Sequence, residues 1–254
     1  MHNGFRLAVG TLTVLRVRPP TVVDRAVAGR AMMLAPVAAL VPAVAALAVV
    51  LAGSWAGSPP PVIGALSVGA LALASRGLHL DGLADTADGL ASGYDRERAL
   101  AVMRSGDVGP AGAATLLVMV LAQAAAVAAL AVGWRGAVVV AAAVVTSRGA
   151  LTVCCARPVP SARPQGLGAT VAGTVPVTWA VAATAASASG LGLVVALVGL
   201  PWWAGPLAVL LGLGAAGILL RRCVQRLGGV TGDVLGACVE VALTTSLVVL
   251  ATVA

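Results

Sequence analysis

The amino-acid sequence predicts an all-α fold, a polytopic membrane helix bundle of about seven transmembrane helices with a cytoplasmic N-terminus. Of its 254 residues, 60% are hydrophobic, whereas soluble domains are usually about 45–50% apolar. The mean hydropathy is +1.03. Several uncharged stretches reach the length of about 20 residues that a helix needs to cross a bilayer core. The arginines, finally, are confined to alternate connections between these stretches.

Seven apolar segments follow one another along the chain, and the residues before them have a different character. Residues 4–16 favour an interfacial amphipathic helix over a signal peptide, because Arg16 and Arg18 stand where a cleavage site would follow. No linker divides the chain, so we expect a single integral-membrane domain over residues 1–254. The expected spans are 31–52, 61–78, 110–132, 137–156, 173–198, 201–220 and 234–254.

The net charge of +7 comes from arginine alone, because the chain contains no lysine. The connections at 53–60, 133–136 and 199–205 hold only Arg135, and the other arginines lie on the opposite side. The positive-inside rule then predicts a multi-pass protein of the cell (inner) membrane with an outside C-terminus. The basic charge therefore indicates topology, with the lipid bilayer as partner and no nucleic acid. The oligomeric state stays open, and a homo-oligomer is among the states allowed.

The four cysteines fit no metal-binding spacing, and we expect buried, unreactive thiols.

Six of the nine acidic residues lie between Arg76 and Asp107. Asp81, Asp85 and Asp88 follow an i, i+4, i+7 spacing, which places them on one helix face. We expect the helix of span 61–78 to continue past the bilayer edge into this segment. Unpaired carboxylates repel one another, and a hard cation with oxygen ligands would offset that repulsion. A plain solvated helix end would mix the signs of its charges, so these three residues are predicted metal ligands and catalytic residues.

A second acidic pair opens the last span. Asp233 could be a simple N-cap, but Glu240 lies about two turns deeper on nearly the same face. A carboxylate at that depth is costly unless it is paired with an arginine, protonated or metal-bound. Asp233 and Glu240 are therefore further candidate metal ligands, and the neighbouring Thr231 is a candidate substrate-binding residue.

Two more residues near the first cluster are candidate catalytic groups. Asp107 either caps the following helix or faces the acidic cluster. His79 lies two residues before Asp81 and off its helix face, so a hydrogen bond to substrate or a carboxylate is favoured over metal binding. Asp95 and Glu97 alternate with arginines and indicate an exposed turn or helix start.

Arginines close to the spans are candidate ligands for diphosphate oxygens, which a guanidinium can bind in bidentate fashion. Each is equally explained as a topology charge, although Arg148 stands within an apolar helix. Arg163 precedes a glycine turn at 166–168 that could form an anion-binding loop. The candidate substrate-binding arginines are Arg76, Arg104, Arg148, Arg157 and Arg163.

Four ordered motifs resemble the cobalamin synthase (adenosylcobinamide-GDP ribazoletransferase) family. They are L-H-L-D-G-L-A-D-T-A-D-G at 78–89, R-S-G-D-V-G-P-A-G at 104–112, R-P-Q-G-L-G at 163–168 and G-G-V-T-G-D-V-L-G-A-C-V-E at 228–240. The resemblance implies a Mg²⁺-dependent transferase with adenosylcobinamide-GDP and α-ribazole (or its 5′-phosphate) as substrates, GMP as product and a site facing the cytoplasm. Asp88 or Asp107 would take the hydroxyl proton.

A looser similarity links residues 85–89, D-T-A-D-G, to CDP-alcohol phosphotransferases. Ser92 and Gly93 replace the Ala-Arg pair of that signature, and its closing half does not follow at the usual distance. A lipid phosphotransferase therefore stays as an alternative. A carboxylate-relay transporter is another, but it would spread its carboxylates along a pathway through the bilayer.

Overall fold

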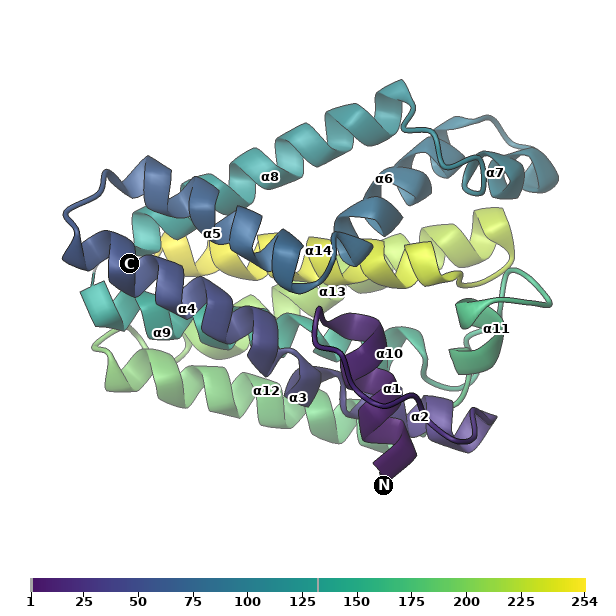
Figure 1. The fold of residues 1–254 in the computed structure, drawn as a ribbon, viewed down its shortest axis with the longest axis horizontal. Helices are drawn as coiled ribbons and strands as arrows, with labels where there is room; N and C mark the ends of the chain where they lie inside the picture. The colour runs from purple at the N-terminus through teal and green to yellow at the C-terminus, as the bar shows by residue number, and fades with distance from the viewer. Residues whose placement is uncertain (1, 132) are drawn as a thin grey trace.

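The structure is a computed structural model, and it describes residues 2–131 and 133–254. Its long helices run side by side along the longest axis of the molecule (Figure 1). The helices of the described residues, in chain order, are α1 (His2–Leu12), α2 (Arg25–Met33), α3 (Ala35–Ala38), α4 (Leu40–Trp55), α5 (Pro60–Ala74), α6 (Leu78–Ala91), α7 (Arg96–Val102), α8 (Pro110–Leu130), α9 (Gly133–Ser147), α10 (Gly149–Cys154), α11 (Leu167–Val171), α12 (Val177–Leu197), α13 (Ala204–Leu227) and α14 (Gly232–Ala251).

Six helical segments in the described residues are long and apolar enough to cross a membrane. They are Ala35–Trp55, Pro110–Leu130, Gly133–Cys154, Val177–Leu197, Ala204–Leu227 and Gly232–Ala251. The bent pair α5 and α6 raises the number to seven if it counts as one span. The predicted all-α, multi-pass bundle is therefore confirmed, with shifts of a few residues at the span ends. Pro176, for example, delays the fifth span, because it precedes the first residue of α12.

The expected continuation of the second span into the acidic segment as a single helix is wrong. Arg76 and Gly77 both adopt left-handed backbone conformations, with φ of 55° and 70°. The Gly77 N–H donates to the Ala72 carbonyl at 2.7 Å, which closes the end of α5. The chain then turns by 93° before α6. The acidic residues therefore lie on a separate helix, whose direction is set by this turn.

The two ends of the bundle differ in composition. The connections α4–α5, α8–α9 and α12–α13 gather with the C-terminus at one end, and the acidic helix α6, α7 and α11 lie toward the other (Figure 1). Trp55, Trp134, Trp202 and Trp203 are exposed at the first end, which also carries Arg135 as its one arginine among the described residues. Exposed tryptophans are typical of the level of the lipid head groups. Because the other arginines lie toward the opposite end, we call it the arginine-rich end.

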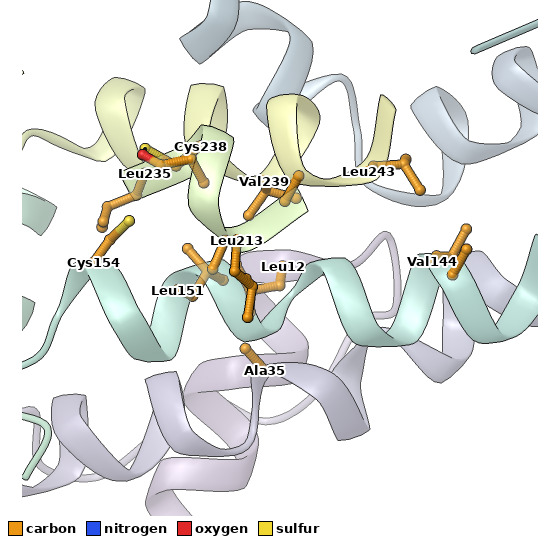
Figure 2. Close-up of a cluster of buried hydrophobic side chains, with 14 of the residues drawn as sticks. Leu12, Ala35, Val144, Leu151, Cys154, Leu213, Leu235, Cys238, Val239 and Leu243 are labelled. Carbon is orange, nitrogen blue, oxygen red and sulfur yellow. The ribbon is translucent and has the colours of Figure 1, made fainter. Parts of the chain in front are cut away.

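Helix α14 lies at the centre of the bundle, in contact with α6, α8, α9, α10 and α13. Its Leu235, Val239 and Leu243 are almost fully buried. Figure 2 shows Cys154 of α10 close to Leu235 and Cys238 of α14 in this core. All four cysteines are buried and free, which confirms the expectation of buried thiols. The central helix thus connects the apolar core to the acidic residues at its first turn.

The N-terminal segment is helical, as expected, and packs against the rest of the bundle. Helix α1 contacts α2 and α3, and it buries Ala8, Val9 and Leu12. At Gly4, a Cβ atom would lie 2.8 Å from the Cβ of Arg30. The absence of a side chain there allows α1 to lie directly on α2.

Candidate active site at the arginine-rich end

Helix α6 lies unusually close to α14, and glycines on both helices allow this approach. A Cβ atom on Gly82 would lie 2.6 Å from the carbonyl oxygen of Asp233. A Cβ atom on Gly236 would lie 3.1 Å from the Cα of His79. Small residues permit such backbone contact between membrane helices. The contact brings the first acidic cluster beside the start of α14, where the second cluster begins.

The carboxylates of the two clusters interact electrostatically. Asp85 is partly buried, and the charges of Asp81, Asp233 and Asp88 all act on it. Asp81 is exposed, and Asp233 is half-buried. Four carboxylates from two distant parts of the chain therefore share one region of negative potential. Such a region attracts a cation, because the attraction offsets the mutual repulsion of the carboxylates.

Thr231, and not Asp233, caps α14. The Thr231 Oγ1 accepts a hydrogen bond from the Val234 N–H at 3.2 Å, as an N-cap side chain does. The same hydroxyl donates to Oδ2 of Asp233 at 3.1 Å. The simple N-cap explanation of Asp233 is therefore wrong. The capping hydroxyl holds the Asp233 carboxylate in place and leaves its other oxygen available.

Arg163 provides a positive charge beside these carboxylates. Its guanidinium donates to the Leu100 carbonyl at 2.9 Å. Partial burial lowers the pKa of Arg163, and the charges of Asp233 and Asp85 oppose that shift, whereas Arg104 adds to it. A guanidinium does not lose its proton in proteins near neutral pH, so Arg163 stays a cation. Arg163 and Arg104 can therefore face an anion that approaches the carboxylates.

The motif at 163–168 packs against the motif at 228–233. A Cβ atom on Gly168 would lie 2.5 Å from the Val230 carbonyl oxygen. Arg163, Gln165 and Gly166 line a small pocket of about 160 Å³ together with Thr231 and Asp233. Two segments more than sixty residues apart thus form one wall beside α6. The expected anion-binding loop lies next to the expected metal ligands.

Asp88 is bound to the start of the next spanning helix. Its Oδ2 accepts from the Gly109 N–H at 2.7 Å, and its Oδ1 accepts from the Gly112 N–H at 2.8 Å. Asp88 therefore supplies the capping interactions of α8, and the expected cap by Asp107 is wrong. Asp107 is exposed and lines a pocket of about 450 Å³ with Asp88. The alternative expectation, that Asp107 faces the acidic segment, agrees with this position.

Glu240 belongs to a buried polar cluster deeper in the bundle. Its Oε2 accepts from Nε2 of Gln123 at 2.7 Å, and the same amide donates to Thr244 at 2.9 Å. Nδ1 of His79 lies 4.0 Å from Oε1 of Glu240, and neither ring nitrogen of His79 has a hydrogen-bond partner. Arg148 is 2% exposed and acts electrostatically on both groups. Sequence reasoning missed Gln123, although an amide within the apolar α8 is the signal that could have identified it.

The structure separates three candidate arginines from the carboxylates of α6 and the Asp233 region. Arg148 is enclosed and donates to Ser147 Oγ at 3.0 Å. Arg76 donates to the carbonyls of Gly10 and Thr11, at 2.8 and 3.1 Å, and so attaches the end of α1. Arg157 lines a different hollow, formed by residues 157–161 and Arg25. For these three, a role in substrate binding stays a prediction from the sequence.

The residues fit Mg²⁺ held jointly by protein and substrate. Within residues 2–131 and 133–254, no three His, Cys, Asp or Glu side chains form a ready metal-ion cage. Mg²⁺ is commonly bound by one or two carboxylates, with water and substrate phosphates as the other ligands. Asp81, Asp85 and Asp233 offer such oxygens. Asp88 fits less well because both of its oxygens accept backbone N–H groups, and Glu240 fits less well because it is buried with Gln123 deeper in the bundle.

Comparisons with known proteins match nearly the whole chain. The family model described as cobalamin-5-phosphate synthase matches residues 4–251. A protein of Nocardioides named adenosylcobinamide-GDP ribazoletransferase is 49% identical over 249 residues, which are 97% of each chain. Proteins with the same name from Frankia casuarinae and Bradyrhizobium diazoefficiens are 40% and 34% identical, covering 97% and 92% of this chain and 93% and 87% of theirs. No solved structure matches significantly. The chain belongs to the cobalamin-5-phosphate synthase family.

Proposed function

We propose that this protein is an adenosylcobinamide-GDP ribazoletransferase of the cell membrane, with its active site at the cytoplasmic face. It would transfer adenosylcobinamide phosphate from adenosylcobinamide-GDP to α-ribazole or its 5′-phosphate, and release GMP. The family match and the names of the relatives support this activity. The observation that carries the assignment of the site is the contact of Gly82 with Asp233, because it joins the two acidic motifs.

In the proposed reaction, a hydroxyl of ribazole attacks the phosphorus on the cobinamide side of the diphosphate. The new phosphorus–oxygen bond forms as the bond to the GMP oxygen breaks, and the hydroxyl loses its proton. Asp81, Asp85 and Asp233 would hold Mg²⁺, which when bound neutralises charge on the diphosphate oxygens. Arg163 and Arg104 would stabilise the negative charge that develops on the departing GMP.

Asp107 is the better of the two carboxylates predicted to accept the hydroxyl proton. Both oxygens of Asp88 accept backbone N–H groups of α8, so neither is directed at a substrate hydroxyl. Asp107 lines the same pocket and is exposed. We therefore propose that Asp107 takes the proton and that Asp88 holds the start of α8 in place.

The test uses the full chain in lipid nanodiscs with adenosylcobinamide-GDP and α-ribazole, and it measures GMP by chromatography. We expect GMP release that stops in EDTA and returns with added Mg²⁺. Asp85→Asn replaces a proposed carboxylate ligand of the metal with a neutral amide and is expected to lower the rate of GMP release by about 100-fold. Glu97→Gln changes an exposed carboxylate of the neighbouring helix α7 and is the matched control, expected to keep the wild-type rate.

Two results would contradict the proposal. Release of CMP from a CDP-alcohol, without GMP from adenosylcobinamide-GDP, would identify a lipid phosphotransferase instead. Undiminished activity in Asp81→Asn, Asp85→Asn and Asp233→Asn alike would show that these residues are not the metal ligands. It would contradict the proposed site even if the reaction itself is confirmed.

A further inference from the structure

A groove on the lipid-facing side of the bundle lies between α12, the end of α10 and Leu210 of α13. It has a volume of about 480 Å³, and α12 forms one wall with alanine and valine side chains and Thr184. Val153 and Leu210 line it from the other helices. Val181 is 64% exposed and Leu210 57% exposed, although both lie on spanning helices. The groove therefore opens toward the acyl chains of the bilayer.

The length of the groove corresponds to one leaflet of a membrane. Its lining runs along α12 from Val177 to Ala188, a rise of about 16 Å at 1.5 Å per residue. The hydrocarbon core of a bilayer is about 30 Å thick. Val177 is the first residue of α12, and the exposed Trp179 marks the interface beside it. The groove thus reaches from the interface at the arginine-rich end to about the middle of the bilayer.

A cation lies at the interfacial end of the groove. Arg157 lines the groove and also a second hollow of about 380 Å³, which Arg25 shares. The Arg25 guanidinium is fixed by the carbonyls of Ala169 and Ala172, at 3.1 and 2.7 Å. In the described part of the chain, no residue forms an ion pair or side-chain hydrogen bond with the Arg157 guanidinium. No acidic residue lines this hollow, so two cations face it.

We propose that the groove and the hollow together bind one anionic phospholipid of the leaflet at the arginine-rich end. An acyl chain fills the groove along α12, and the phosphate lies between Arg157 and Arg25. Guanidinium groups bind phosphate oxygens through strong charge-assisted hydrogen bonds, and basic residues at the interface attract anionic head groups. An apolar groove as long as one leaflet can hold the acyl chain of a lipid. A free anion such as inorganic phosphate has no acyl chain to occupy it. None of the lining of the groove or the hollow belongs to α6 or α14, and Ser161 is the one residue that this lining shares with the small pocket beside Asp233.

Lipid titrations followed by native mass spectrometry test the proposal on the delipidated full chain in detergent. The ligands are phosphatidylglycerol, zwitterionic phosphatidylcholine with the same acyl chains, and glycerol 3-phosphate as the head group without chains. We expect phosphatidylglycerol to bind about tenfold more tightly than phosphatidylcholine, the ratio expected for about 1.4 kcal/mol from charge-assisted hydrogen bonds. Glycerol 3-phosphate is expected not to compete, because it cannot occupy the groove.

Two variants change the two parts of the site independently. Arg157→Gln is expected to remove the preference for phosphatidylglycerol, and Ala185→Phe, which fills the groove, is expected to weaken both lipids. The matched controls are Arg98→Gln, another exposed arginine, and Ala182→Phe, an exposed α12 position outside the groove. Both controls should bind phosphatidylglycerol as the wild type does.

Equal binding of the two lipids by the wild type would overturn the proposal, as would unchanged lipid binding in Arg157→Gln and Ala185→Phe. Competition by glycerol 3-phosphate would also overturn it, because it would identify a site for free anions. Size-exclusion profiles and melting temperatures verify the fold of each variant. If one variant does not fold, the other decides, since they lie on different parts of the chain.

Discussion

Asp88 has a structural role that Asp81 and Asp85 do not share. All three lie on one face of α6, but only Asp88 accepts backbone N–H groups from the first turn of α8. A Cβ atom on Gly112 would lie 2.2 Å from Oδ2 of Asp88, so the glycine there is required by the close approach. The charge of Asp88 thus stabilises a helix N-terminus from outside the helix itself.

Replacing Asp88 is therefore expected to affect stability more than replacing Asp81. Asp88→Ala leaves one buried and one partly buried backbone N–H group without a partner, and we expect a loss of about 2 kcal/mol in the free energy of unfolding. Asp81→Ala removes an exposed carboxylate and should change that free energy little. Unfolding of both proteins in mixed micelles with increasing SDS measures the difference. Equal stabilities would contradict the capping role.

At the scale of elements, the sequence predicted most helices because their signals are local. Apolar stretches of sufficient length identified the spans. Asp81, Asp85 and Asp233 stood out because charge is rare in such a chain, and the structure brings them together, whereas their role as metal ligands stays a prediction. The turn between α5 and α6 was not predicted, because Arg76, a residue other than glycine, adopts φ of 55° there and few such residues do. The helical spacing of apolar and acidic residues continues through such a turn unchanged, so the sequence pattern does not indicate the break.

Contacts between elements far apart in the chain were also not predicted from the sequence. From the sequence, Asp107 could cap α8 or face the acidic cluster, and Asp88 was expected to bind metal or take a proton, so its capping of α8 was not predicted. That cap depends on the position of α6 beside α8, which only the fold determines. Gln123 was missed for the same reason, since its partners Glu240 and Thr244 lie on another helix. Sequence patterns thus indicate which polar residues lie in the apolar segments, but not which residues they contact.

The close packing of α6 against α14 predicts a sensitive glycine. Gly82→Ala would place a methyl group 2.6 Å from a backbone oxygen of Asp233, and a backbone atom cannot yield as a flexible side chain can. We expect a loss of about 1–3 kcal/mol in the free energy of unfolding, with reduced GMP release because Asp85 moves away from Asp233.

Gly69→Ala on α5 is the matched control, because a Cβ atom there meets no atom within 4 Å. Alanine has the higher helix propensity, so this control should be at least as stable as the wild type. Equal stability of the two alanine variants would show that α6 and α14 are not in close contact.

For the whole molecule, the distribution of charge and aromatic residues predicts a single orientation in the membrane. The arginines other than Arg135 lie toward the end that carries the candidate active site, and four of the five tryptophans lie exposed at the opposite end. By the positive-inside rule, the arginine-rich connections are expected on the cytoplasmic side. The proposed substrates are large, charged molecules of the cytoplasm, so the same orientation that suits insertion also gives them access to Asp85 and Asp233.

This orientation predicts which surface cysteines react in intact cells. The four native cysteines are buried, so they should contribute little background to labelling with a membrane-impermeant maleimide. Ala56→Cys, exposed in the α4–α5 connection, is expected to react from outside. Ser105→Cys, exposed before α8 at the arginine-rich end, is expected to react only after the membrane is permeabilised. The wild type provides the background, and the reverse pattern would place the acidic residues outside, where the proposed cytoplasmic substrates could not reach them.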